Sequence, residues 1–153
     1  MQTQVYTEMA LGKAGLISRQ TPCPEHLPFV AEGDDLVAGA FCFEGTDAEK
    51  TVVGKKADAT KVAGLVIFEK LQPRLHGLAD GMKINAGEEV AVLLKGCAYI
   101  TAPEAVVKGD KIGVNPATGE TIKFVEEDAY SIDTGFVVLT GANAGDTCEI
   151  MKL

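Results

Sequence analysis

Apolar and polar residues alternate in short stretches along the chain, and glycine, asparagine and acidic residues separate these stretches. Alternation over four to eight residues is typical of a strand with one buried face. Strands this short and this numerous predict a mainly β fold, a jelly-roll-like β-sandwich or barrel, rather than a sheet of βαβ units. From residue 29 onward the predicted strands are 36–43, 63–69, 89–95, 98–101, 111–114, 121–124, 135–140 and 147–152.

Helix-forming patterns are scarce by comparison. Only residues 58–62 and 71–78 favour a short helix, and Pro73 interrupts the second stretch. The stretch KGDKIGVNPATGETIKF, residues 108–124, instead predicts a hairpin, because Pro116 presets φ and Gly119 tolerates a positive φ at the turn. The tip of this hairpin carries no reactive group, so we interpret it as a rigid structural element.

A different composition precedes residue 29. Pro22, Pro24 and Pro28 stand within seven residues, and prolines at this density remove backbone donors and favour extended geometry. We therefore divide the chain into an extended N-terminal arm, residues 1–28, and a β domain, residues 29–153. The arm is too apolar for a freely solvated tail, so either its own domain or a partner should cover it. Its apolar side chains are Val5, Tyr6, Met9, Leu11, Leu16 and Ile17.

Charge and hydropathy narrow the classes of partner. The 153 residues carry a formal net charge of −8 without a cluster of Lys or Arg, so no nucleic-acid partner is expected. No stretch approaches the roughly 18 apolar residues of a membrane span, so no membrane partner is expected either. The first 20 residues lack the pattern of a secretory signal, which predicts synthesis inside a cell and free thiols.

Residues able to carry out catalysis are few. Neither Ser18 nor Ser131 lies in a GxSxG motif, and the two histidines, His26 and His76, lie in the arm and in a loop. Cys23 and His26 have the spacing of a zinc-ligand pair, but no second pair completes three or four ligands. The sequence therefore predicts no enzyme activity, no cofactor and no metal site.

Two further groups of residues have structural interpretations. We interpret the acidic cluster at residues 126–128 as a solvated surface, with a weak divalent-ion contact as the alternative. Cys42, Cys97 and Cys148 lie in strand-like runs and are interpreted as small buried apolar residues. The chain has no Trp and its three tyrosines are scattered, which disfavours stacking on sugars or bases.

Three segments, taken in order, resemble a known family. They are VAGLVIFEK (62–70), INAGEEVAVLLKGCAYITAPEAVVKGDKIGVNPATGE (84–120) and GFVVLTGANAGDTCEIMKL (135–153). The shared pattern includes Gly87-Glu88 with Val90 and Val92, then Gly109-Asp110, then Asn115-Pro116 before Thr118-Gly119. With these turn and strand motifs, residues 29–153 resemble the structural cement, or head decoration, proteins of tailed bacteriophages.

The resemblance implies a non-enzymatic virion protein on the outer surface of a phage head, made in the host cytoplasm. It implies contact with the major capsid protein and assembly into a homodimer or homotrimer, without a cofactor. The expected role is stabilisation of contacts between capsid subunits. We expect the arm to supply the contacts, through Tyr6, Met9, Leu11, Leu16, Ile17, Pro22, Pro24 and Pro28. The alternatives are another virion component such as a tail or adaptor protein, a small all-β ligand-binding module, or a nucleotide hydrolase.

Overall fold

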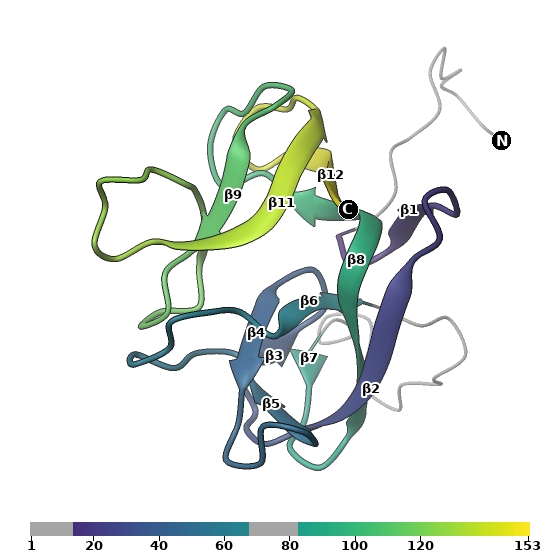
Figure 1. Cartoon of the computed structure of the whole chain (residues 1–153), viewed down its shortest axis with the longest axis vertical. Coiled ribbons are helices and arrows are strands. Elements are labelled where there is room, and N and C mark those ends of the chain that lie inside the picture. Colours follow the sequence, from purple (N-terminus) through teal and green to yellow (C-terminus); the bar gives the residue numbers. More distant parts are fainter. Residues whose placement is uncertain (1–13, 68–82) are drawn as a thin grey trace, which may run out of the picture.

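The computed structural model describes residues 14–67 and 83–153, and in these residues every regular element is a strand (Figure 1). The mainly β prediction is therefore confirmed. The strands are β1 (Ile17–Arg19), β2 (Glu25–Ala31), β3 (Leu36–Val37), β4 (Phe41–Glu44), β5 (Thr51–Val53), β6 (Gly64–Ile67), β7 (Lys83–Ile84), β8 (Glu89–Thr101), β9 (Lys111–Val114), β10 (Thr121–Lys123), β11 (Ile132–Thr140) and β12 (Thr147–Lys152).

Five strands close into a barrel, in the order β8-β2-β5-β4-β6 and back to β8. All neighbours in it are antiparallel except β2 and β5, which pair in parallel at Val30 and Ala31. Four further strands continue from β8 as an open sheet, β8-β12-β11-β9-β10, and β1 pairs with β8 beside it. Strands β3 and β7 pair with each other as a separate antiparallel ribbon. In Figure 1 the barrel lies below and the open sheet above, with β8 running through both.

Two hydrophobic clusters follow from the alternation along the barrel strands. Cys42, Val66 and Val92 point into the barrel, where they pack with Val52 and Val90. Their neighbours in the sequence point the other way, onto the buried face of the open sheet. This second and larger cluster joins Phe41, Phe43, Leu65, Ile67, Ala91 and Leu93 to Ile100, Ile112, Val114, Phe136, Val138, Cys148 and Ile150. Strands buried on both faces are continuous apolar runs in the sequence.

The predicted strand 36–43 is wrong as a single element. It divides into β3 and β4 around Gly39, which has a φ of +87°. An added Cβ at Gly39 would stand 2.8 Å from the Cβ of Ala14, so the chain before β1 crosses closely over this turn. Alternation alone could not show the break, because apolar residues continue on both sides of it.

Other predicted strands need smaller corrections. Runs 89–95 and 98–101 form one strand, because pairing continues from Lys95 with β2 to Gly96 with β12. The pattern missed β1, β2, β5 and β7, while β9, β10, β11, β12 and the described part of 63–69 agree with it within a few residues. Residues 58–62 form no helix but a loop with a turn, in which the Ala59 N–H donates to the Lys56 carbonyl at 3.0 Å. The second helical candidate, 71–78, and with it His76, lies wholly outside the described residues.

The hairpin at residues 108–124 is present, formed by β9 and β10. Its tip rests on the loop that follows β5. The Lys56 N–H donates to the Pro116 carbonyl at 2.8 Å, and Gly119, with a φ of +75°, lies against the carbonyl of Gly54. The tip therefore joins the open sheet to the barrel, which agrees with its interpretation as a structural element.

Substitution of Gly119 tests this junction. We expect Gly119→Ala to lower the free energy of unfolding by about 3 kcal/mol, since a positive φ and a close carbonyl act together. Gly109 is the matched control, because its φ is +95° and nothing lies within 4 Å of an added Cβ. Gly109→Ala should cost about 1 kcal/mol. Equal melting temperatures for the two variants would contradict the role of the tip.

Candidate interaction surface

A buried carboxylate holds the N-terminal segment against the open sheet. Among the described residues, Glu149 on β12 is the only charged residue that is buried, with 6% of its surface exposed. Arg19 on β1 donates to both of its oxygens, from Nε to Oε1 at 2.6 Å and from an Nη to Oε2 at 3.0 Å. The Ser18 hydroxyl donates to Oε1 at 2.6 Å, and Thr140 on β11 donates to Oε2 at 3.4 Å. These four residues form what we name the Glu149 clamp.

The clamp keeps Glu149 ionised. The hydrogen bond from Arg19 lowers the pKa of the Glu149 carboxyl, and Ser18 adds to this, whereas burial acts in the opposite direction. A two-pronged Arg–carboxylate pair fixes both position and orientation. The clamp therefore fixes β1 to β12, across 130 positions of sequence.

The described part of the predicted arm, residues 14–28, belongs to the sheet. Ile17 packs against the larger core cluster, and Gly15 and Leu16 form backbone hydrogen bonds with Tyr99 of β8 at 2.9 Å. Further along, β2 forms one wall of the barrel. The backbone is extended here because it is paired, and β2 continues through Pro28 without a break at the predicted boundary.

The predicted contact residues therefore fall into three groups. Leu16, Ile17, Pro22 and Pro24 are half-buried, while Pro28 is exposed. Tyr6, Met9 and Leu11 lie outside the described residues. Beside Pro28, sequence reasoning missed two exposed apolar side chains, Leu27 and Val30, which are 49% and 41% exposed.

Strand β2 presents side chains rather than a free backbone edge. The Val30 N–H donates toward β5, to Lys50, and the Ala31 N–H donates to Glu88 at the start of β8. Because N–H groups alternate in direction along a strand, the nitrogen of Pro28 faces the same side as that of Val30, away from β8. A proline at this place leaves no donor for another strand. The exposed apolar groups that β2 offers at this place are the side chains of Leu27, Pro28 and Val30.

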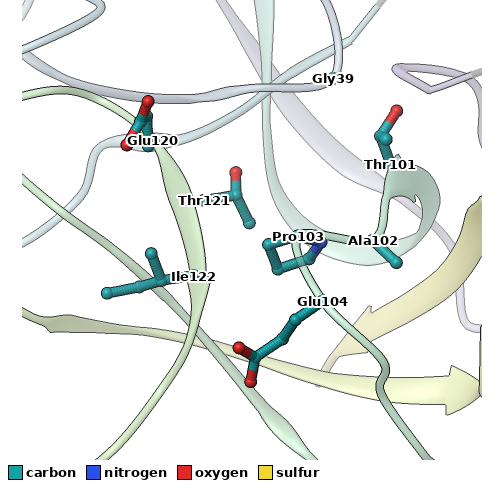
Figure 2. Close-up of a pocket in the computed structure, with 8 residues that line it drawn as sticks. All are labelled: Gly39, Thr101, Ala102, Pro103, Glu104, Glu120, Thr121 and Ile122. Atoms are coloured by element: carbon teal, nitrogen blue, oxygen red, sulfur yellow. The ribbon is translucent and has the colours of Figure 1, made fainter. Parts of the chain in front are cut away.

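An open cleft of about 540 Å³ lies between the β9–β10 hairpin and the end of β8. Figure 2 shows Thr121 pointing from β10 toward Pro103, with Ile122 on the opposite side of the same strand. The cleft is lined by Gly39, Thr101, Ala102, Pro103, Glu104, Glu120, Thr121 and Ile122. Among the described residues that line it, Glu104 and Glu120 are the charged ones, and none is a Ser, Cys or His. Glu104 and Glu120 were not predicted as site residues, because their local sequence signals turns and does not show that the two carboxylates meet at one cleft.

Candidate metal ligands do not gather in the described residues. In residues 14–67 and 83–153 no three His, Cys, Asp or Glu side chains are grouped closely enough to hold a metal ion. Cys23 lies in the bend before β2 and His26 lies on β2 itself. Across the same residues, no helix is long and apolar enough to cross a membrane.

Comparison with known proteins identifies the family. The family described as structural cement protein (E217 gp24/Pam3 gp6), a family of phage proteins, matches residues 1–152. The chain belongs to this family. It is therefore a structural protein of the phage capsid, as its turn and strand motifs predicted, and the family is not one of enzymes.

Solved structures show the same fold in phage particles. A chain in the capsid of Myoviridae phage XM1 aligns with a TM-score of 0.71 at 16% identity, over 99% of this chain and 96% of that chain. The N base of the head fiber gp8.5 of bacteriophage phi29 aligns with a TM-score of 0.51 at 8% identity, over 85% and 94%. At these identities the likeness concerns the fold alone. No curated protein matches the chain.

The cysteines of this family member differ sharply in exposure. All four are free thiols, of which Cys42, Cys97 and Cys148 are buried and Cys23 is exposed. The interpretation of these three as buried apolar residues is thus confirmed. Burial raises the pKa of Cys42 to about 12 and that of Cys148 to about 11, so neither forms a thiolate at neutral pH.

Thiol titration tests this assignment. We expect one thiol in four to react with Ellman's reagent in the native protein at pH 8, and all four after denaturation. Cys23→Ser should remove the native reaction. A native reaction that persists in Cys23→Ser would show that a strand carrying a buried cysteine opens readily.

Glu149→Gln tests the clamp. The amide keeps the shape but loses the charge that binds Arg19, so the melting temperature at pH 7 should fall by about 5 °C. The control is Glu127→Gln, an exposed carboxylate on the β10–β11 loop, which should melt as the wild type does. Hydrogen exchange should accelerate first at residues 15–19.

The clamp also predicts a pH dependence. Because folding lowers the pKa of Glu149, its stabilising contribution is complete above its ordinary pKa of about 4.3. The contribution is lost as the pH falls through the lowered value of the folded state. The difference in melting temperature between wild type and Glu149→Gln should thus be constant from pH 7 to 5 and shrink below pH 4. A difference that grows on acidification would contradict the clamp.

Proposed function

We propose that the protein binds the outer surface of a phage head and stabilises contacts between subunits of the major capsid protein. The observation that carries this proposal is the match to the structural cement family along residues 1–152. The fold shared with a chain of the XM1 capsid supports it. In the described residues the largest buried side chains belong to the two cores, which gives the domain the rigidity that such a role requires.

The charge favours the outer surface over the interior. A protein with a formal net charge of −8 would be repelled by packaged DNA, whereas the exterior imposes no such cost. This position also agrees with synthesis in the host cytoplasm and with addition to a head that has already formed. A tail or adaptor position is the nearest alternative, and an image of the virion that locates the copies decides between them.

We assign capsid binding to the segment before residue 14 and to the exposed face of β2. Residues 15–19 and 25–28 are paired with or clamped to the domain. Fully extended, the thirteen residues before Ala14 could span about 43 Å at ~3.3 Å per residue. Tyr6, Met9 and Leu11 are the proposed anchors of this segment. On the domain itself, Pro28 and Val30 supply exposed apolar surface on one face of β2, and Leu27 supplies it on the other. A stable contact of this kind buries about 1,600 Å² in total.

Self-association is part of the proposal. A homodimer or homotrimer would present several N-terminal segments to adjacent capsid subunits, and linked contacts bind far more tightly than single ones. Light scattering of the purified protein measures this state directly.

Deletion of residues 1–13 tests the role of the segment. We expect retention on heads to fall at least about tenfold, because a few apolar anchors dominate such interfaces. Retention of the triple variant Tyr6→Ala, Met9→Ala, Leu11→Ala on heads should fall by a similar factor. Both should keep the wild-type melting temperature, since the Glu149 clamp remains, whereas deletion to residue 20 would remove the clamp as well. Full occupancy of heads by the shorter chain would overturn the assignment.

A further inference from the structure

The last strand of the open sheet has an unpaired edge. Strand β10 pairs only with β9, where the Phe124 N–H donates to Lys111 and the Asn115 N–H donates to the Glu120 carbonyl. By alternation, the backbone groups of Ile122 face β9, and those of Thr121 and Lys123 face away from it. In the described residues, no backbone hydrogen bond reaches Thr121 or Lys123 from that outer side.

The same strand is a wall of the open cleft. Thr121 and Ile122 line it on one side, and Thr101 to Glu104 line it on the other (Figure 2). The edge of β10 is therefore accessible from the cleft. Strand β2 differs, because Pro28 removes the donor that would face outward there. Strand β10 contains no proline and carries Thr121, Ile122 and Lys123 at its three positions, so each of its residues keeps a backbone donor.

The charges at this cleft are one-sided. Of the described residues that line it, the charged ones are Glu104 and Glu120. The nearest lysine on β10, Lys123, is engaged with Asp110 at 2.9 Å. An extended segment that carries Lys or Arg would complement these carboxylates, whereas an acidic chain, including a second copy of this one, would be repelled.

The cleft also adjoins the proposed path of the N-terminal segment. Gly39 lines the cleft, and the backbone at Ala14 and Gly15 crosses it so closely that an added Cβ at Gly15 would stand 2.9 Å from the Gly39 nitrogen. Ala14 and Gly15 therefore lie at the border of the cleft. A partner bound to the segment joined to Ala14 would come close to the cleft.

The geometry points to the cleft beside β10 as a docking site for an extended, basic segment of the major capsid protein, which adds to the β10 edge as a further strand. This inference rests on the proposed function, since it names the partner segment that the same surface takes. Main-chain hydrogen bonds to Thr121 and Lys123 would supply affinity, and Glu104 and Glu120 would select a segment bearing Lys or Arg. The contact would be short, because three residues of β10 span about 10 Å.

The first experiment compares two double variants with equal changes in charge. Glu104→Gln with Glu120→Gln neutralises the cleft, and Glu49→Gln with Glu127→Gln neutralises two exposed carboxylates outside it. Binding is measured on heads assembled without the cement protein, at low and at high salt. We expect the cleft variant to bind about tenfold more weakly at low salt, with the gap closing at high salt, and the control to bind within twofold of wild type.

The second measurement is hydrogen exchange of the amides in residues 119–124. On heads, the Thr121 and Lys123 amides should become protected, while the Ile122 amide, already bonded to β9, should change little. Unchanged exchange at Thr121 and Lys123 in head-bound protein would overturn the inference. Protection that is already complete in the free protein and is lost on dilution would also overturn it, because the occupant would be a second copy of this chain.

The two proposals fail in different ways. Wild-type protein that does not bind heads at all ends the proposed function, and with it this inference. If the wild-type protein binds heads, the two double variants bind with equal affinity and the β10 amides stay unprotected, the inference is wrong but the proposed function stands. If heads bind the wild-type protein and the control variant equally well but bind the cleft variant more weakly, the result supports both the proposed function and this inference.

Discussion

Strand β8 is the constraint on which the architecture depends. Its first half pairs with β2 on one side and with β6 on the other, which closes the barrel, and its second half pairs with β12 and β1. Val90 and Val92 face the barrel interior, whereas Ala91 and Leu93 face the open sheet. The two cores are therefore joined through one continuous strand. A shift of its register by one residue would exchange the two sets of side chains and disrupt both cores at once.

This arrangement makes the domain rigid, as a structural protein of the capsid requires. Two cores that share β8, a hairpin tip seated on the loop after β5 and a clamp at Glu149 all fix distant segments to one another. In the described residues, the clamp is the one place where a buried charge joins distant segments. Arg19 donates to both oxygens of the Glu149 carboxylate. Removing one partner of such a pair lowers the free energy of unfolding by more than the pair contributes, because the other charge is left buried without a partner. The N-terminal segment thus starts from a fixed point on the domain.

The surface divides into regions of different chemistry. At β2, Leu27, Pro28 and Val30 are exposed apolar residues, and Pro28 removes a backbone donor from the strand's outer edge. At β10 the edge is open and acidic residues line the adjoining cleft. Apolar burial at the first site and main-chain pairing at the second are distinct sources of binding energy. Neither requires a reactive side chain, which agrees with membership of a structural family.

From its sequence alone, this chain could be identified as mainly β and as similar to cement proteins, because strand alternation and turn residues are local signals. The runs at 89–95, 111–114 and 147–152 were predicted because their own side chains carry the pattern. Strands β1, β2 and β5 were missed, since β1 and β5 are three residues long and β2 is mostly exposed. The split at Gly39, the fusion of two runs into β8 and the Glu149 clamp depended on residues far apart in sequence. A local pattern shows which residues can be buried, but only long-range pairing determines what buries them.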